Sequence, residues 1–190
     1  MNRFVLGMLF LYSIGYANAQ NINQARFKLS EDGKSFHFIE LELDNGMWIG
    51  IDSCTEIAYV ENSFGMPLGE GDLELMGVRV KYYDHFDIHD PRDKLKSIGN
   101  IIFKYNNVFD IHDKPGTLKS LGNIEIKYYK VFDKHDPKGK VKSVGGVRIS
   151  YYNIFDPAER LGDLKSIKGN SSSLWVTSPS AARFGRFNRY

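Results

Sequence analysis

The amino-acid sequence predicts an all-β protein. Tandem β-hairpin repeats of about 23 residues are expected to form an antiparallel meander sheet or roll, with a β-rich N-terminal cap. Three observations support this prediction. Phenylalanines recur every 23 residues, at Phe86, Phe109, Phe132 and Phe155. Before each of them, apolar and polar residues alternate with a period of two, as in a half-buried strand. Turn sequences rich in Gly and Asp separate the alternating segments.

The first 19 residues have the features of a secretory signal peptide. A basic residue, Arg3, precedes an apolar run from Phe4 to about Tyr16, and small residues follow at Ala17 and Ala19. We expect cleavage after Ala19 and export to the periplasm, the cell surface or the extracellular space. A membrane-spanning helix needs ~20 consecutive apolar residues, and no later segment reaches that length. We therefore expect no transmembrane segment in the mature chain.

The chain has a single cysteine, Cys54, which cannot form an internal disulfide. Unpaired cysteines are commonly small buried apolar residues. No periodic His lies near it, so we expect Cys54 to be buried rather than reactive.

Residues 20–76 form an acidic region, with 3 basic and 11 acidic residues. The segments RFKLS, SFHFIELEL and MWIGI are β-prone and are separated by the turn sequences EDGK and DNG. The segment 57–77 looks like a degenerate copy of the repeat, and terminal units of arrays are often atypical because they cap the stack. We expect a cap of about five strands here.

Residues 77–168 contain four copies of the repeat, which begin near Gly77, Gly99, Gly122 and Gly145. Two-residue links such as Gly99-Asn100 predict tight hairpins between copies. The sequence Asp-Pro-Lys-Gly at 136–139 predicts a reversal inside a copy. One strand face is apolar or aromatic throughout, so we expect it to form the core. Its positions are Val78, Val80, Tyr82, Ile101, Phe103, Tyr105, Ile124, Ile126, Tyr128, Val147, Ile149 and Tyr151.

A β-solenoid or a leucine-rich-repeat-like coil is the alternative architecture, because 23 residues is also a permitted period for leucine-rich repeats. Leu118, Leu121 and Ile124 have the spacing with which such a repeat opens. Only Asn106 occupies the place of the buried Asn of that family, and the other copies have Tyr there. The antiparallel interpretation is therefore favoured.

Each copy contains Tyr-Tyr or a related pair, then an Asp-rich turn, then a segment such as Gly-Lys-Val-Lys-Ser-Val at 139–144. Over about ninety residues this phrase resembles the tyrosine-aspartate repeats of large bacterial surface and toxin shells. The chain lacks their compact Tyr-Asp-x-x-Gly-Arg core because its loop is longer. The resemblance therefore implies no particular function.

Residues 169–190 form a basic tail, with 3 basic residues and no acidic one. Leu174, Trp175 and Val176 can add a closing strand, after which Ser, Pro and Gly predict a loose end.

The polar face of the predicted strands is the first candidate binding surface. Stacked copies would form a basic and aromatic stripe, in which Tyr packs on sugar rings and Lys neutralises carboxylate or phosphate. We expect an anionic envelope polysaccharide as ligand, with a protein partner over the tyrosines as the alternative. Residues 77–168 hold 18 basic and 12 acidic residues, a mixture that does not indicate nucleic acid. The candidate binding residues are Arg79, Lys81, Tyr83, Lys104, Lys127, Tyr129, Arg148 and Tyr152.

The Asp-rich turns are the second candidate site, because imidazole and carboxylates together can bind Zn²⁺. Equivalent positions of a meander lie two strands apart, ~9.6 Å, which is too far to share one ion. The fourth copy also lacks the His. We expect Asp to shape the turn and His to pack beside Phe, with metal or small-ligand binding as the alternative. The residues are Asp87, His89, Asp110, His112, Asp133 and His135.

No catalytic motif stands apart from the repeat, and no cofactor is expected. If the chain were a hydrolase, its site would lie in the acidic region, at His37, Glu40, Glu42 and Asp44. The predicted function is that of an exported, non-catalytic binding or scaffolding module at the cell envelope or outside the cell.

Overall fold

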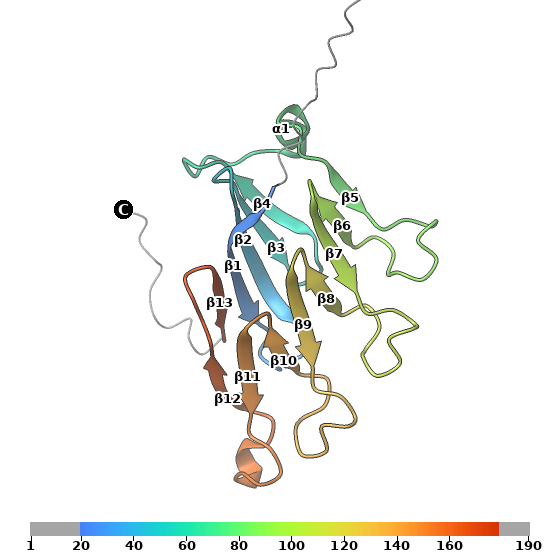
Figure 1. Ribbon diagram of the computed structural model, residues 1–190, viewed down its shortest axis with the longest axis vertical. Helices are drawn as coiled ribbons and strands as arrows, with labels where there is room; N and C mark the ends of the chain where they lie inside the picture. The colour runs from blue at the N-terminus through green and yellow to red at the C-terminus, as the bar shows by residue number, and fades with distance from the viewer. Residues whose placement is uncertain (1–19, 179–190) are drawn as a thin grey trace, which may run out of the picture.

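In the computed structural model, residues 20–178 form two open β-sheets that pack face to face (Figure 1). Strands dominate, and all but one pair of neighbouring strands run antiparallel in this part of the chain. The predicted all-β class is therefore confirmed. The predicted signal peptide, residues 1–19, and the end of the predicted tail, residues 179–190, lie outside the described residues.

The first sheet contains the N-terminal strands and one strand from the end of the chain. Its order is β13-β1-β2-β3-β4. The closing strand predicted at 174–176 exists as β13, but it joins the N-terminal sheet, where it pairs parallel with β1. The strands are β1 Ile22–Leu29, β2 Phe36–Leu43, β3 Trp48–Asp52, β4 Ile57–Glu61 and β13 Leu174–Thr177.

The second sheet has eight strands whose order, β12 to β5, follows the chain. Each hairpin pairs antiparallel, as Figure 1 shows for β9 and β10. In a solenoid, equivalent strands of successive copies would stack parallel to one another, so this pairing does not agree with the alternative coil. The strands are β5 Val80–Tyr82, β6 Leu95–Ile98, β7 Ile101–Tyr105, β8 Leu118–Leu121, β9 Ile124–Tyr128, β10 Val141–Val144, β11 Val147–Tyr151 and β12 Leu164–Lys168.

Two kinds of turn join these strands. The predicted two-residue turns each begin with a glycine whose φ lies between +51° and +55°, which suits a tight hairpin. These glycines are Gly99, Gly122 and Gly145. The other turns are long loops that all emerge at the same edge of the sheet (Figure 1). The last loop includes the short 3-10 helix η1, Ala158–Arg160.

A β-bulge that the sequence did not reveal recurs in every long hairpin. In the β5–β6 pair the register shifts between Lys81 and Tyr82, which leaves Lys96 as the extra residue. Leu95 and Ile98 are therefore both fully buried, although three positions separate them in the sequence. The register shifts at the equivalent place in the β7–β8, β9–β10 and β11–β12 pairs.

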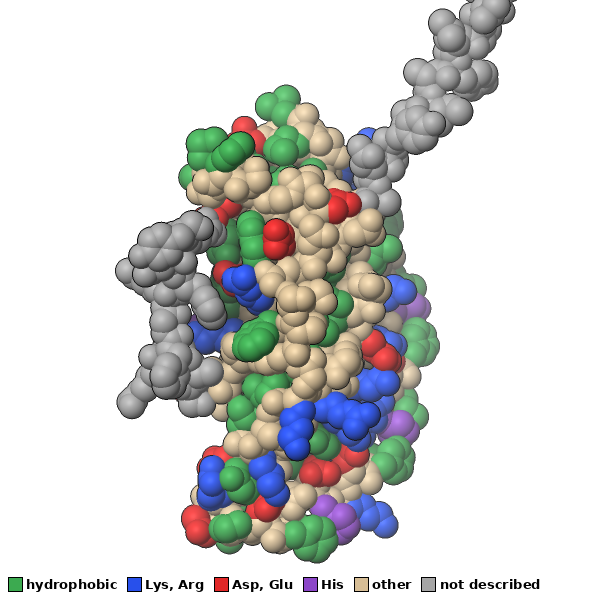
Figure 2. Space-filling model, turned by 60° about the vertical axis from the view of Figure 1, so that its left-hand side comes forward, with side chains coloured by type: hydrophobic (Ala, Val, Ile, Leu, Met, Phe, Trp, Pro, Cys, Tyr) green, Lys and Arg blue, Asp and Glu red, His purple; other side chains and the backbone are tan. Residues whose placement is uncertain are grey.

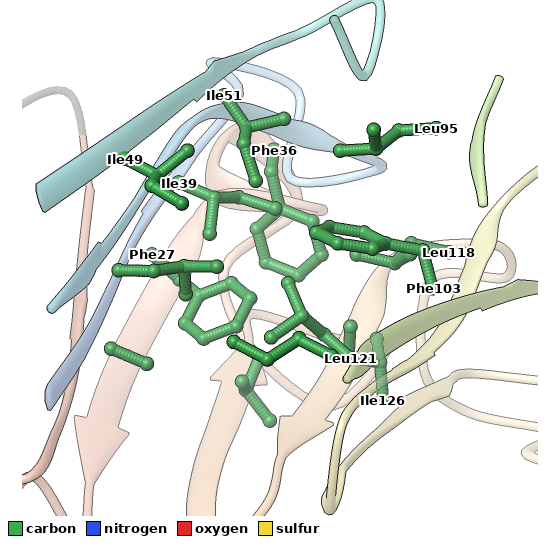
Figure 3. Packing of buried hydrophobic residues seen from close by; sticks show 14 of the residues in the cluster. Phe27, Phe36, Ile39, Ile49, Ile51, Leu95, Phe103, Leu118, Leu121 and Ile126 are labelled. Atoms are coloured by element: carbon green, nitrogen blue, oxygen red, sulfur yellow. The ribbon is translucent and has the colours of Figure 1, made fainter. Parts of the chain in front are cut away.

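The apolar faces of the two sheets form one hydrophobic core (Figure 3). Phe27 and Ile39 of the first sheet lie opposite Phe103 and Leu121 of the second, and all four are at most 1% exposed. Burial of each such side chain contributes about 1.5–3 kcal/mol.

Nine of the twelve predicted core positions of the repeat are buried. Val80 and Ile124 are partly buried. Tyr82 is 39% exposed, and its prediction as a core residue is wrong. Tyr82 lies on β5, the edge strand of the sheet, and among residues 20–178 no further strand lies beyond it.

The turn between β1 and β2 forms hydrogen bonds that join the first sheet to the last hairpins of the second. The Gly33 carbonyl oxygen accepts hydrogen bonds from Val141 N (2.8 Å) and from Tyr151 Oη (3.1 Å). Gly33 has φ +68°, and a Cβ at this position would lie 2.7 Å from Oη of Tyr151. The close approach of the two sheets here depends on a glycine.

The segment 57–77 forms β4, a turn and helix α1, Glu70–Leu75, instead of a repeat-like hairpin. Asp72 Oδ2 accepts a hydrogen bond from Gly69 N (2.8 Å), which stabilises the start of the helix. Leu73 on this helix is fully buried. Within residues 20–178, no helix has the length and apolar character to cross a membrane.

Cys54 is exposed, contrary to the prediction. It lies in the turn between β3 and β4, where Asp52 Oδ1 accepts hydrogen bonds from Cys54 N (2.8 Å) and Glu56 N (3.0 Å). The apolar residues of the flanking strands fill the core instead.

We expect Gly33→Ala to destabilise the protein by about 1–3 kcal/mol more than Gly139→Ala. Both glycines have positive φ, +68° and +77°, so both variants strain the backbone. Nothing lies within 4 Å of a Cβ at position 139, whereas the Cβ at position 33 meets the Tyr151 ring. Urea unfolding of both variants measures the difference, and equal losses would contradict the proposed importance of this contact.

Candidate binding surface

The outer face of the eight-stranded sheet carries a set of exposed cations, which we call the cationic face. Among the described residues, only Lys127 of this set has an acidic partner within 4 Å, Glu125 Oε2 at 3.0 Å. The remaining cations project from the sheet without ion pairs to the described carboxylates. The cationic face consists of Arg79, Lys81, Lys104, Lys127, Arg148 and Lys168.

The tyrosines predicted to share this face do not lie on it. Tyr83 and Tyr129 are only 7% and 9% exposed. Each ring covers the next copy of the repeat: Tyr83 Oη donates to the Phe103 carbonyl (2.8 Å) and Tyr129 Oη to that of Ile149 (3.0 Å). Burial raises the pKa of both hydroxyls. Their prediction as ligand-binding residues is therefore replaced by a structural role.

Tyr152, the equivalent residue of the fourth copy, is partly exposed. The Arg160 guanidinium lies 3.9 Å above its ring and donates a hydrogen bond to its Oη (2.6 Å). Of the three predicted tyrosines, this one alone remains accessible.

The cationic face is most concentrated over strands β9 to β12. Lys127 lies opposite Ser143, Ser143 opposite Arg148, and Arg148 opposite Lys168, so these residues form one row across the sheet. They line a hollow of about 370 Å³ together with Ser150 and Ser166. Hydroxyl donors and three cations around one hollow suit a carboxylate, sulfate or phosphate group.

A serine lies beside these cations in each copy and recurs every 23 residues in the sequence. This signal was not identified from the sequence. Ser97 lies opposite Lys81, Ser120 opposite Lys104, and Ser143 opposite Lys127. The bulges place these serines outward beside a lysine of the same strand.

The Asp residues of the loops are clamped by these bulge lysines. In each copy the Lys Nζ lies 2.5–2.7 Å from the Asp Oδ1, and a backbone N–H of the same loop donates to Oδ2 at 2.8–3.1 Å. The pairs are Asp87–Lys96, Asp110–Lys119, Asp133–Lys142 and Asp156–Lys165.

The clamps lower the pKa of all four carboxyls. For Asp87, Asp110 and Asp156 the hydrogen bond from the lysine is the largest cause, and the backbone hydrogen bond adds to it. For Asp133, desolvation is the largest single cause and raises the pKa. The hydrogen bonds from Lys142 and from Lys130 N together outweigh it, so the pKa is lowered. These carboxylates therefore stabilise the conformation of their own loops.

The three recurring loop histidines pack on phenylalanine, as the sequence predicted, but on the phenylalanine of the following copy. The ring centroids are 4.7–4.8 Å apart, and His side chains lie next to hydrophobic ones along one edge of Figure 2. No group of three or more potential metal ligands occurs within the described residues. The pairs are His89–Phe109, His112–Phe132 and His135–Phe155.

A second link joins successive loops. Asp113 Oδ2 forms an ion pair with Lys130 Nζ (2.7 Å), and Asp136 Oδ1 accepts a hydrogen bond from Asn153 Nδ2 (3.2 Å). Asp90 accepts a longer one, 3.5 Å, from Asn107. The loops are therefore linked to one another in a continuous series, the loop ladder, at one end of the strands.

The outer side of this ladder is apolar. The four phenylalanines that reveal the repeat are 69–78% exposed. Ile88 and Ile111 beside them are 76% and 80% exposed. We call this set the phenylalanine ridge, and its four defining residues are Phe86, Phe109, Phe132 and Phe155.

The residues of the hydrolase hypothesis do not form one cluster. His37 is at the start of β2, and Asp44 follows its end, so they are separated by the length of the strand, ~20 Å. Asp44 Oδ2 accepts a hydrogen bond from Asn21 N (3.2 Å). Glu40 and Glu42 lie between them on the outer face of the first sheet.

Comparison with protein-family models, with curated proteins and with solved structures found no match to this chain.

We expect Asp110→Asn to lower the free energy of unfolding at pH 7 by less than about 1 kcal/mol, because the clamp is a surface ion pair. The folded-state pKa of Asp110 is below 3.8, so the clamp is fully effective above about pH 5 and is lost as the pH falls through the folded pKa. The variant and the parent should therefore converge once the pH falls below the folded pKa of Asp110. Urea midpoints measured from pH 7 into the acid range test this.

The matched control is Glu159→Gln, because Glu159 is exposed and forms no ion pair within the described part of the chain. Its midpoint should follow the parent at every pH. A constant deficit of Asp110→Asn at all pH values would contradict an ionic clamp.

Proposed function

We propose that this protein is an exported, non-catalytic module that binds an anionic polysaccharide of the cell envelope across its cationic face. In this proposal each copy of about 23 residues contributes one hairpin to a meander, and so repeats one binding step along the sheet. The supporting observation is the row Lys127–Ser143–Arg148–Lys168. Among the described residues, Lys127 pairs with Glu125 of its own strand, whereas Arg148 and Lys168 have no carboxylate within 4 Å.

The spacing of the cations suits a polymer. Lys81, Lys104 and Lys127 lie on alternate strands, and each is displaced by two residues from the row of the one before. Two strand spacings and two residue rises place successive cations on the order of 12 Å apart along a diagonal. A chain of acidic sugars carries charges at regular intervals along its length, so one chain can reach several of these cations at once. A single small anion would use only the hollow over β9 to β12.

The sheet is well suited to hold these cations in place. Clamps fix the loops at one edge, and the core fixes the other face. Binding then orders only the lysine and arginine side chains themselves, which limits the entropy lost on association.

We expect the protein to be retained by polygalacturonate beads, and retention to fall as NaCl rises from about 50 to 500 mM, because salt screens exposed charges. The triple variant Lys104→Gln, Lys127→Gln, Arg148→Gln should weaken retention at least about tenfold. Beads of neutral dextran report non-ionic adsorption.

The matched control removes the same charge from the loops: Lys114→Gln, Lys134→Gln, Lys138→Gln. These lysines are also exposed, and this variant should bind like the parent. If both triple variants lost retention equally, net charge alone would explain the binding, and this result would contradict the proposal. Loss of binding on addition of EDTA would favour metal binding at the Asp and His loops instead.

A protein partner is the second candidate, and the phenylalanine ridge favours it. Contiguous exposed apolar groups on a rigid support often mark protein interfaces. The His contacts hold the ridge in one conformation.

A further inference from the structure

The outer face of the first sheet carries a groove that is separate from the cationic face and from the loops. Its volume is about 550 Å³, and it is lined by β1, β2 and β13 and by Ser171 and Ser172. Both tryptophans of the chain lie on this face. Trp175 on β13 lines the groove and is 45% exposed. Trp48 lies three strands away, on β3, and packs against Arg26.

A line of paired residues crosses the five strands at the groove. Arg26 lies opposite Trp175 on one side and opposite Glu40 on the other. Glu40 lies opposite Gly50, and Gly50 opposite Tyr59. The line therefore has an aromatic ring at each end and a guanidinium and a carboxylate between them.

Gly50 allows the Tyr59 ring to lie on the sheet surface. A Cβ at position 50 would be 2.2 Å from Cε1 of Tyr59. The ring stacks with Phe38, with centroids 5.8 Å apart and planes 25° from parallel. Two rings thus form an apolar platform beside the groove.

The polar groups between the rings are held by one another. Glu40 Oε1 accepts a hydrogen bond from Tyr59 Oη (2.7 Å), and Glu40 Oε2 lies 3.9 Å from Arg26 Nη1. Arg26 Nη2 donates to Gln24 Oε1 (2.8 Å), and its guanidinium lies 4.8 Å from the centre of the Trp48 ring. The Arg26 and Glu40 side chains are still 42% and 34% exposed, so they can meet a ligand without first breaking this network.

We propose that this groove is a saccharide-binding site. A sugar ring has an apolar C–H face, which can pack on Trp175 or Phe38, and a rim of hydroxyls. Arg26 and Gln24 can donate hydrogen bonds to such hydroxyls, and Glu40 can accept them. A mostly apolar hollow with a few fixed polar groups is the usual form of a small-molecule site.

Other occupants fit the groove less well. A peptide that added as a strand would pair beside the edge strand β13 and would not lie over the groove, because β1 and β2 are paired on both sides. A lipid chain would remove Arg26 and Glu40 from water and offer them no hydrogen bonds in return. The site does not depend on the cationic face, which lies on the other sheet, so either proposal can fail alone.

Intrinsic fluorescence tests the proposal, because both tryptophans report on the same face. The full chain is titrated with hexasaccharides of glucose, of N-acetylglucosamine and of galacturonic acid, in low and in high salt. We expect at least one of them to quench tryptophan fluorescence with little salt dependence. Isothermal titration calorimetry then gives the affinity of the variants, including those that lack a tryptophan.

Trp175→Ala should weaken that binding at least about tenfold without changing the urea midpoint, because its ring lies outside the core. Gly50→Ala should also weaken it, by displacing Tyr59 from the sheet. Phe155→Ala, which removes a more exposed ring (75%) from the phenylalanine ridge, should bind like the parent. Binding that survives Trp175→Ala, or quenching by phosphatidylcholine vesicles but by none of the hexasaccharides, would overturn the assignment.

Discussion

The contact between the two sheets is the constraint on which the rest of the structure depends. Each sheet has one apolar face, and within residues 20–178 the other sheet covers it, together with residues such as Leu73 of helix α1. Open antiparallel sheets are not stable alone with such a face exposed. The Gly33 carbonyl joins the sheets at one corner, and β13 carries the end of the chain back to β1. The acidic N-terminal region therefore buries apolar surface that the repeat array would otherwise expose to water.

This arrangement separates stability from recognition. The inner faces supply the core, and both outer faces remain available for polar and aromatic groups. The bulge after each loop makes the separation possible, since it lets Leu95 and Ile98 both reach the core while Lys96 reaches Asp87. A regular strand would have sent one of the two apolar residues outward.

The sequence was sufficient to predict the strands and the tight turns, because alternation and Gly-initiated turns are local signals. It was sufficient to place Lys104 and Lys127 on the outer face for the same reason. The burial of Tyr83 and Tyr129 was not predictable. Both residues follow the end of their strand, where the alternation of buried and exposed residues no longer applies, and each ring packs on the following copy of the repeat. The pairing of β13 with β1 joins residues about 150 positions apart, which local patterns do not specify. The groove at Trp175 follows from that pairing.

The fourth copy distinguishes contacts that form within one copy from contacts that a copy makes with the next one. The clamp Asp156–Lys165 lies within the copy, and it is present. His89, His112 and His135 each contact the next copy, and the fourth copy, which has no successor, has Ala158 at this position. Tyr152 likewise lacks a following strand to cover and turns to Arg160 instead. The missing histidine and the different contact of Tyr152 both occur where the partner would lie beyond the last copy, as expected where each unit contacts only its neighbours.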